Sequence, residues 1–417
     1  MRIALALHDR LDVNSGGAGV VLNLAEAYQR RGHEVSLVSM ETLQGMFNRL
    51  PRVRAVLASN GFRLADPLFP LFCAVYFSRH LRGHDVIDAS TCDAWLYGRL
   101  NGGRTRPLLV THSHGIEHML HRADVESAVR EGPPLSWKYR LYRGTLKLRA
   151  SARSLRVADL ALFLNRTERD FAVADLGIDP VRAHVVPNGL PRAMLGLAPP
   201  AQAGGGQAFR VAQIASYLPR KGTRYGAEAL NRFLRRHPGA QMLFLGTGCP
   251  PERVLGDFDA DVRQRIEVVP RFDRLELPRL LRGCAVKLFP TLAEGFGLGL
   301  LEAMACGLAP VTTSTDGPRD IVTHEVDGLI VPPRDAAAIE QALERLFHDR
   351  TLLGRLQHAA WQRAQAFDWD SIAAARLELY TEFLRERRAG GAVPRSGSWR
   401  SRAAMKTEGR RECRTRL

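Results

Sequence analysis

Two glutamates bracket a glycine-rich turn in the segment PTLAEGFGLGLLEAMACG, with Glu294 before the turn and Glu302 after it. The preceding AVKLFP has the apolar run of a buried strand, and LGLLEAMACG has the spacing of a helix. Glycines let a backbone turn sharply and pass close to a ligand. The unpaired N–H groups of a first helical turn favour an anion. We therefore expect a phosphate or a polar sugar face at this turn.

Carboxylates beside a phosphate need another explanation, because like charges repel. A carboxylate accepts hydrogen bonds and can hold both hydroxyls of a vicinal diol. Glu294 and Glu302 could face two diols on either side of one diphosphate, and a nucleotide-diphosphate sugar has that order of ribose, diphosphate and hexose. The alternative is a plain strand–loop–helix in which one glutamate complements the helix dipole.

The segments that position this turn fall into two similar sets. Short apolar runs such as RIALAL, VIDAS and LALFLN alternate with helical stretches, and the pattern restarts at FRVAQIAS after the Pro/Gly/Ala-rich LPRAMLGLAPPAQAGGGQA. The predicted class is α/β, with two Rossmann-like doubly wound parallel sheets facing an inter-domain cleft. We expect five segments: an N-terminal domain at 1–190, a linker at 191–208, a C-terminal domain at 209–366, a helix at 367–388 and a disordered basic tail at 389–417.

The quoted turn, continued as AEGFGLGLLEAMACGLAPVTT, closely resembles the E-x7-E motif of family 4 glycosyltransferases, which are retaining enzymes of the GT-B fold. GGAGVVLNLAEAYQRRGHEVSLVS, HVVPNGL, YLPRKG, LFLGTG and DGLIVPPRD resemble further family landmarks in the family's order. FDWDSIAAARLELY resembles the segment leading into the last helix, which in the family crosses back to the N-terminal domain. The resemblance covers residues 1 to about 380. It implies transfer of a hexose from a nucleotide-diphosphate sugar to a hydroxyl.

The resemblance also implies donor-site residues. Lys221 of PRKG matches the lysine that holds the donor diphosphate, and the chain has only five lysines. The family usually places an arginine five residues earlier, where this chain has Ser216; Arg220 is the candidate for the second cation, with different geometry. The whole predicted donor set comprises Gly16, Gly17, Ser216, Arg220, Lys221, Glu294, Gly295, Phe296, Gly297, Leu298 and Glu302.

A strand-end histidine lies by the reacting sugar in the family, and VTHSHGIEHM offers His114, with His112 as the alternative. The resemblance implies that the leaving phosphate takes the acceptor proton, so His114 would orient the sugar. The predicted catalytic residues are His114, Glu294 and Lys221. His112, Glu117 and His118 are expected on the acceptor side.

The segment DFDAD, Asp257 to Asp261, has the D-x-D spacing of metal-binding glycosyltransferases of other folds. It lies in a polar loop outside the predicted cleft edge. The resemblance implies a metal-independent enzyme in which cations and helix dipoles stabilise the leaving diphosphate. We therefore expect no metal and no cofactor, with the nucleotide sugar as co-substrate.

The net charge of +16 is concentrated in two segments. The tail from Ala389 carries eight Lys/Arg, and Leu135 to Arg156 carries seven and no acid. The second segment has the composition of a basic helix with aromatics, which favours either an anionic membrane surface or a solvated face. No nucleic-acid module is recognisable, so we expect no nucleic-acid partner.

No apolar run reaches the roughly 18–20 residues of a membrane span, and MRIALALHDR lacks the features of a signal peptide. We expect a cytoplasmic protein, at the inner face of the membrane if the basic helix binds lipid. The expected acceptor is a cell-envelope or lipid-linked glycan. Two alternatives stay open: a non-catalytic sugar-nucleotide-binding scaffold, and a sugar-nucleotide epimerase of the same fold.

Overall fold

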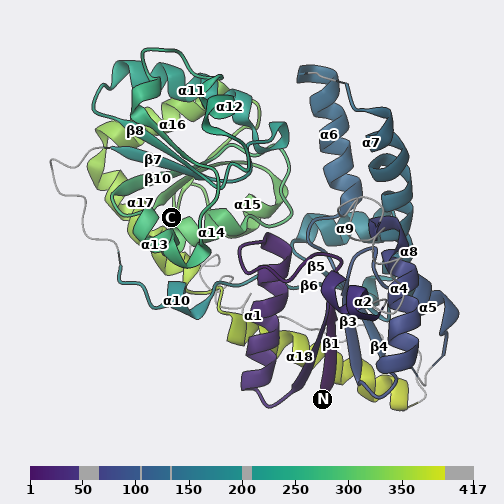
Figure 1. Ribbon diagram of the computed structural model, residues 1–417. Coiled ribbons are helices and arrows are strands. Elements are labelled where there is room, and N and C mark those ends of the chain that lie inside the picture. Colours follow the sequence, from purple (N-terminus) through teal and green to yellow (C-terminus); the bar gives the residue numbers. More distant parts are fainter. Residues whose placement is uncertain (47–64, 104–105, 132–133, 200–208, 390–417) are drawn as a thin grey trace, which may run out of the picture.

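The computed structural model describes residues 1–46, 65–103, 106–131, 134–199 and 209–389. Two six-stranded parallel sheets, each covered by helices, form two domains side by side (Figure 1). This confirms the predicted α/β class with two Rossmann-like doubly wound sheets. The sheets are parallel because each strand is followed by a helical crossover.

The N-terminal sheet has the order β2-β1-β3-β4-β5-β6. Its strands are β1 (Arg2–Ala6), β2 (Glu34–Val38), β3 (Val86–Ser90), β4 (Leu108–His112), β5 (Leu160–Phe163) and β6 (Ala183–Val185). All five residues of β3 and of β4 are buried, as expected of central strands covered on both faces. Chain direction across the sheet reverses between β1 and β3, and loops at such a switch point commonly bind ligands.

Helices cover both faces of this sheet and begin at its carboxyl-end loops. They are α1 (Gly16–Arg30), α2 (Met40–Met46), α4 (Ala65–His80), α5 (Trp95–Leu100), α6 (Glu117–Glu131), α7 (Trp137–Leu141), the π-helix η2 (Tyr142–Lys147), α8 (Leu148–Val157), α9 (Arg166–Ala174) and the 3₁₀ turn η3 (Pro180–Arg182). The basic segment Leu135 to Arg156 is helical as α7, η2 and α8. With α6, α7 stands beyond the sheet, beside the second domain (Figure 1), whereas α8 packs into the N-terminal core through Ala152 and Leu155.

The C-terminal sheet has the order β12-β11-β10-β7-β8-β9. Its strands are β7 (Arg210–Ile214), β8 (Gln241–Leu245), β9 (Ile266–Val269), β10 (Cys284–Phe289), β11 (Ala309–Thr313) and β12 (Leu329–Val331). One face packs under α11 and α16, through Leu230, Phe233, Ile339 and Leu343. The other face packs under α14 and the end of α17.

The remaining elements of the C-terminal half are short turns and the cover helices. They are α10 (Arg192–Leu195), η4 (Pro219–Lys221), α11 (Thr223–Arg236), α12 (Pro251–Leu255), η5 (Arg263–Arg265), η6 (Arg274–Glu276), α13 (Leu277–Leu280), α14 (Leu298–Ala305), α15 (Asp316–Ile321), α16 (Ala336–His348) and α17 (Arg350–Ala364). The predicted linker 191–208 thus begins with a helical turn, and 200–208 lies outside the described residues. So does the predicted tail beyond Ala389.

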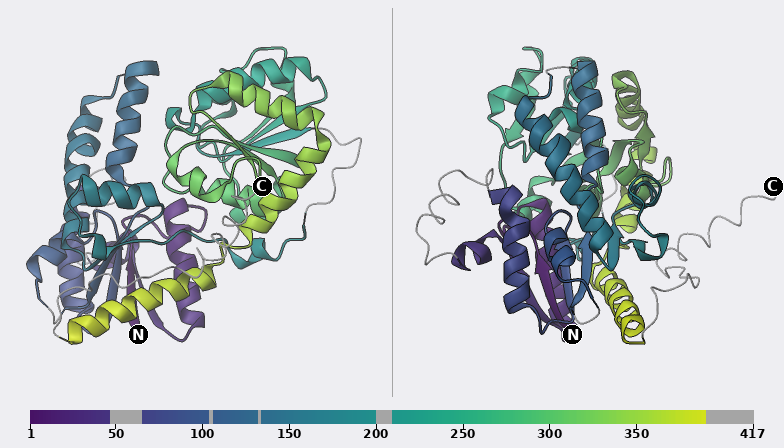
Figure 2. Two further views of the ribbon diagram at one scale, coloured as in Figure 1. Left: turned by 180° about the vertical axis from the view of Figure 1, so that it is seen from behind. Right: turned by 90° about the vertical axis from the view of Figure 1, so that its right-hand side faces the viewer.

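The last helix, α18 (Trp369–Arg388), begins at the C-terminal domain and runs along the N-terminal one (Figure 2). Its N-cap Asp368 pairs with Leu190, where the chain first leaves the N-terminal domain. Its apolar face, including Ile372, Leu379 and Phe383, shares a core with β1 and α1. Burial of these large side chains holds α18 against the N-terminal sheet. In the described residues no helix combines the length and apolarity needed to cross a membrane.

Candidate active site

The predicted donor turn follows β10 and leads into α14, with the K-G pair of η4 packed against its start. Gly222 has φ +68, and a Cβ there would lie 1.8 Å from the carbonyl oxygen of Pro290. The carbonyl of Arg220 accepts a hydrogen bond from the backbone N–H of Leu292 at 2.8 Å. Only glycine permits both the left-handed backbone and this close approach. The pair therefore fixes Lys221 beside the turn.

Lys221 and Glu294 form an ion pair across the turn, between Nζ and Oε2. Both side chains retain access to solvent, at 14% and 18% exposure. The ammonium of Lys221 also lies over the ring of Phe289, 5.7 Å from its centroid. The structure thus brings two predicted catalytic residues together as partners of each other.

Glu302 lies one turn into α14 and is only 2% exposed. Its Oε1 is 3.2 Å from Nε of Arg274 in η6, and its Oε2 has no hydrogen-bond partner among the described residues. Burial raises the pKa of Glu302, against the opposing charges of Arg274 and Lys287. The sequence analysis did not anticipate Arg274 beside this carboxylate.

Lys287 on β10 is a second residue that the sequence analysis missed. It is completely buried, and its Nζ donates to the carbonyl oxygen of Ile214 at 3.3 Å. A Cβ on Gly299, at the start of α14, would lie 2.8 Å from that same oxygen. Burial lowers the pKa of Lys287 well below its usual value. A titratable amine therefore lies directly beneath the first turn of α14.

A cluster of polar side chains occupies the ends of β3 and β4 in the N-terminal sheet. His112 Nε2 lies 3.1 Å from His114 Nε2, and Ser90 Oγ lies 3.1 Å from the same His114 nitrogen. His112 Nδ1 lies 2.6 Å from Oδ1 of the buried Asp88. Both predicted histidines therefore belong to one hydrogen-bonded unit. Burial and the neighbouring His112 lower the pKa of His114 well below its usual value.

The glycine loop that opens α1 lies beside this cluster. A Cβ on Gly17 would lie 3.9 Å from Cε1 of His114, and one on Gly16 would meet no atom within 4 Å. The open space over Gly16 and the half-buried ring of His114 face the end of the sheet where ligands bind in this class of fold. The structure thus brings Gly16, Gly17 and His114 together.

The histidine side and the donor turn meet directly. Asn165 Nδ2 donates to the carbonyl oxygen of Gly295 at 2.6 Å, and a Cβ on Gly295 would lie 2.7 Å from Cα of Gly115. The backbone N–H of Arg274 donates to Oδ1 of Asn14 at 2.8 Å. The carboxyl-end loops of the two sheets therefore form one site.

Two charged pairs lie near the carboxyl ends of the strands in the N-terminal domain. Glu117 Oε1 lies 2.8 Å from Nζ of Lys147 in η2. His8, just after β1, contacts Asp93 at 3.1 Å, and the Asp93 charge raises the pKa of His8 to about 9 against the effect of burial. His118 instead packs against Phe171 of α9, so the structure does not bring it together with the other predicted residues.

Two family models match most of the chain. The model described as Glycosyltransferase Family 4 matches residues 14–193, and the one described as Glycosyl transferases group 1 matches residues 208–349. The chain belongs to the family 4 glycosyltransferases. The recognition made from the E-x7-E turn is therefore confirmed.

Curated relatives align mainly over part of this family 4 chain. Glycogen synthase of Mycobacterium tuberculosis is 32% identical over 165 residues, covering 38% of this chain and 39% of the relative. The UDP-Gal:alpha-D-GlcNAc-diphosphoundecaprenol alpha-1,3-galactosyltransferase of Escherichia coli is 23% identical over 253 residues, covering 57% and 61%. The chain thus matches less than two thirds of the length of either relative.

A solved structure shares the whole fold. Sucrose-phosphate synthase from Thermosynechococcus elongatus superimposes with a TM-score of 0.70 at 20% identity, over 94% of this chain and 100% of that one. At this identity the match shows the fold alone. It supports the GT-B arrangement of this family 4 member.

Four predicted donor residues need separate comment in the family 4 chain. Ser216 is exposed, and the Arg220 side chain is half-buried. The Phe296 side chain packs in the core, 6.0 Å from the ring of Phe367, so it turns away from the donor turn. Leu298 lies between the cores of the two domains. Of these four, only the Phe296 side chain is buried.

The D-x-D aspartates are engaged by other side chains. Asp257 accepts from the Tyr217 hydroxyl at 2.9 Å, and Asp259 and Asp261 both pair with Arg235.

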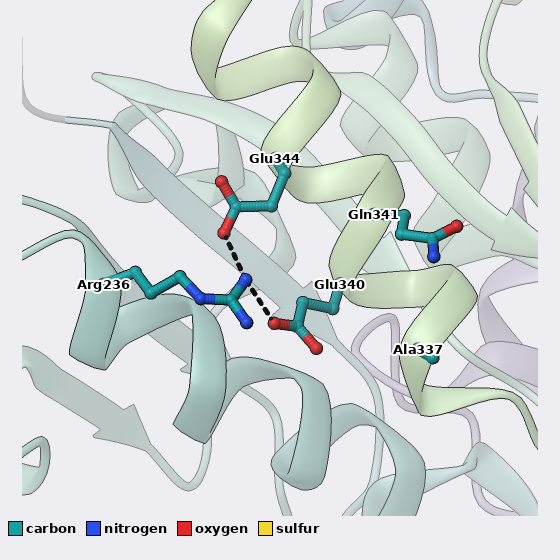
Figure 3. A pocket seen from close by; sticks show the side chains of 5 residues that line it. All are labelled: Arg236, Ala337, Glu340, Gln341 and Glu344. Carbon is teal, nitrogen blue, oxygen red and sulfur yellow. Dashed lines mark hydrogen bonds and ion pairs between the residues drawn. The ribbon is translucent and has the colours of Figure 1, made fainter.

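Within the described residues one group has metal-ligand composition: His237, Glu344 and His348 at the ends of α11 and α16. The neighbouring pocket is lined by Arg236, Ala337, Glu340, Gln341 and Glu344, and Arg236 holds both carboxylates (Figure 3). The pocket contains none of the predicted donor or acceptor residues.

Four of the missed residues share one sequence signal. Asp88 and Ser90 belong to VIDAS, and His8 and Asp93 follow β1 and β3, so each lies at the carboxyl end of a parallel strand. Polar side chains there point to a ligand site in this fold. Arg274 and Lys287 gave no such signal, because their closeness to Glu302 depends on how α14 packs on the sheet.

Proposed function

We propose that this chain is a retaining glycosyltransferase that moves a hexose from a nucleotide-diphosphate sugar to a hydroxyl acceptor. The observation that carries the proposal is the placement of Lys221, Glu294 and Glu302 around the start of α14, against the His114 cluster of the other domain. Cation, carboxylates and helix N-terminus match the diphosphate and the two diols of such a donor. The galactosyltransferase relative is named for a UDP-sugar donor.

The proposed mechanism uses the chain's own charges. Lys221 and the first N–H groups of α14 hold the diphosphate, while Glu294 exchanges its lysine partner for hexose hydroxyls and Glu302 accepts from the ribose. The bond between the anomeric carbon and the phosphate oxygen breaks, and the acceptor oxygen bonds to that carbon on the same face. The acceptor proton passes to the departing phosphate oxygen. His114 orients the sugar, and Lys221 and the helix dipole stabilise the leaving charge.

A thermal-shift screen of nucleotides and nucleotide sugars tests donor binding, because ligand binding raises apparent stability with the logarithm of saturation. We expect one nucleotide family to raise the Tm of wild type and to leave Glu302→Ala unchanged. Glu276→Ala, an exposed glutamate of η6, is the matched control and should respond like wild type. A wild type that responds to no nucleotide would contradict donor binding, whereas donor binding without transfer would favour the scaffold alternative, which the exposed Ser216 also suits.

Transfer, rather than donor binding alone, needs a second measurement. The enzyme should release nucleotide diphosphate only when an acceptor is present, and the donor sugar should not change configuration without one. Conversion of the free donor would instead identify an epimerase.

We also propose that no metal takes part, so EDTA should leave the rate unchanged. A rate abolished by EDTA and restored by a divalent cation would contradict that part.

The proposed acceptor is a cell-envelope or lipid-linked glycan, reached at an anionic membrane. The basic helical segment leaves Trp137, Leu141 and Leu146 exposed between its cations, and the galactosyltransferase relative is named for a lipid-linked acceptor. Vesicles of phosphatidylglycerol should bind the protein, and vesicles of phosphatidylcholine should not. Neutralising Lys138, Arg140 and Arg143 to Gln should abolish binding, whereas Arg279→Gln, on the other domain, should not.

A further inference from the structure

The polar cluster behind His114 continues through the N-terminal sheet to α18. Tyr380 of α18 donates its hydroxyl proton to Oδ2 of Asp88 at 2.5 Å, and Nη1 of Arg376 lies 3.7 Å from the same oxygen. Asp88 accepts on its other oxygen from Nδ1 of His112. All four side chains are buried. One line of contacts thus runs from α18 to Asp88, His112 and His114.

The balance of buried charges determines whether Asp88 is ionised and which nitrogen of His112 carries a proton. Burial works to raise the pKa of Asp88, but the charge of Arg376 and the hydrogen bonds from His112 and Tyr380 outweigh it and hold that pKa below its usual value. An ionised Asp88 has only acceptor oxygens, so the proton on His112 must be on Nδ1. The guanidinium of Arg376 already neutralises the carboxylate. The buried cluster already holds one carboxylate and one guanidinium, so the arrangement without a third, uncompensated charge leaves Nε2 of His112 as an acceptor.

The unprotonated Nε2 of His112 determines where the neighbouring His114 ring carries its proton. His114 Nε2 lies 3.1 Å from it and 3.1 Å from Ser90 Oγ, while the Ser90 hydroxyl proton has two other acceptors, His112 Nε2 at 3.3 Å and the carbonyl oxygen of Ala6 at 3.4 Å. His114 must therefore carry its proton on Nε2. Among the described residues its Nδ1 has no hydrogen-bond partner, and the ring is partly exposed. That nitrogen is left as an acceptor toward the site.

We propose that Asp88 and Tyr380 are positioning residues that hold His114 as a neutral ring with Nδ1 bare, so that it accepts a hydrogen bond from a substrate hydroxyl. This rests on the proposed function and narrows the role of His114 to a hydroxyl acceptor rather than a donor to phosphate. It also gives α18 a role beyond packing. The helix begins at the C-terminal domain and contacts Asp88 through Arg376 and Tyr380 in its middle, so it links the two half-sites.

The first test needs no substrate. ¹⁵N-histidine NMR reads which nitrogen of each ring is protonated, and spectra of His114→Gln and His112→Gln assign the two signals. We expect His114 to be neutral with the proton on Nε2 from pH 6 to pH 9. The titratable and charged groups around it are His112, His8, Arg376 and Asp88. A proton on Nδ1, or an imidazolium at pH 7, would overturn the inference.

Asp88→Asn should reverse which ring nitrogen carries the proton in His112 and in His114. With the Tyr380 hydroxyl donating to its oxygen, the amide must present N–H to His112, which moves the His112 proton to Nε2 and the His114 proton to Nδ1. We expect that NMR change together with a loss of kcat on the order of a hundredfold and a donor KM within threefold of wild type. An unchanged His114 signal with unchanged kcat would refute the inference even in an active enzyme.

Tyr380→Phe tests the same line with a milder change, in case the asparagine variant does not fold. Loss of one hydrogen bond to Asp88 should lower kcat about five- to tenfold and shift the pH profile, with donor KM unchanged. Tyr28→Phe is the control, since its hydroxyl lies 3.2 Å from that of Tyr380 without reaching Asp88. Equal effects of the two variants would indicate packing alone. A wild type without transferase activity would defeat the proposed function while the NMR result still decides this inference.

Discussion

At the carboxyl edge of the N-terminal sheet, buried Asp88 is matched by His112 and Tyr380, and buried Glu168 accepts two backbone N–H groups. At the matching edge of the C-terminal sheet, buried Glu302 keeps one oxygen without a partner, and buried Lys287 has one backbone carbonyl. A buried polar group without a partner costs about 1–3 kcal/mol. The buried carboxylates of the first edge are thus paired on both oxygens before any ligand arrives, whereas Glu302 at the second edge leaves one oxygen for a ligand to satisfy.

The comparison predicts the largest loss at the second edge. Lys221→Ala removes the cation proposed to stabilise the leaving diphosphate, so kcat/KM should fall about 10²- to 10³-fold, or about 3–4 kcal/mol of transition-state stabilisation. Steady-state transfer kinetics measure this. Arg224→Ala, an exposed cation on the same segment, should retain wild-type kinetics. A loss below fivefold for Lys221→Ala would mean that other cations hold the diphosphate.

The second-largest loss of activity is expected where the two edges meet, at the close approach of Gly295 to Gly115. A Cβ on Gly295 would lie 2.7 Å from Cα of Gly115, a distance that real Cβ atoms do not tolerate, so Gly295→Ala should push the two loops apart. We expect kcat/KM to fall about tenfold, because misplacement of reacting groups by about 1 Å costs up to a hundredfold. Gly354→Ala, where a Cβ meets no atom within 4 Å, is the control. Unchanged kinetics for Gly295→Ala would show that the site does not need this close approach.

A third prediction concerns stability alone. Lys287→Met replaces a buried amine with an apolar side chain of similar length, which should raise the free energy of unfolding by about 1–2 kcal/mol at pH 7. Because the pKa of Lys287 is lowered in the folded state, wild type gains stability as pH rises, so the advantage of the variant should shrink toward pH 10. Denaturant unfolding at several pH values measures this. The control Lys138→Met, at an exposed position, should change the free energy of unfolding little. A destabilised Lys287→Met would mean that the amine makes a contact that stabilises the protein without ligand.

The sequence was sufficient for what depends on local pattern. Strand–helix alternation predicted both parallel sheets, and the glycine turn with Lys221, Glu294 and Glu302 predicted which residues surround the start of α14. It could not predict that Arg274 reaches Glu302, because a 28-residue separation along the chain says nothing about distance. It also could not predict the link from Tyr380 to Asp88, which depends on the path of α18 across the other domain. His118 shows the converse, since a polar residue next to Glu117 turned toward Phe171 instead.

The smallest expected effect is the pH dependence of stability that the His8–Asp93 pair gives to the N-terminal edge. Asp93 raises the folded pKa of His8 to about 9, against about 6.5 in an unfolded chain. The contribution of the pair to stability is therefore complete below about pH 6.5 and is lost as pH rises through 9. Because the His8 side chain is 23% exposed, we expect only about 1 kcal/mol. Wild type should exceed His8→Gln by that amount at pH 6 and should match it at pH 10, whereas exposed His358→Gln should show no such trend. A difference independent of pH would mean that packing, rather than the charge on His8, stabilises this edge.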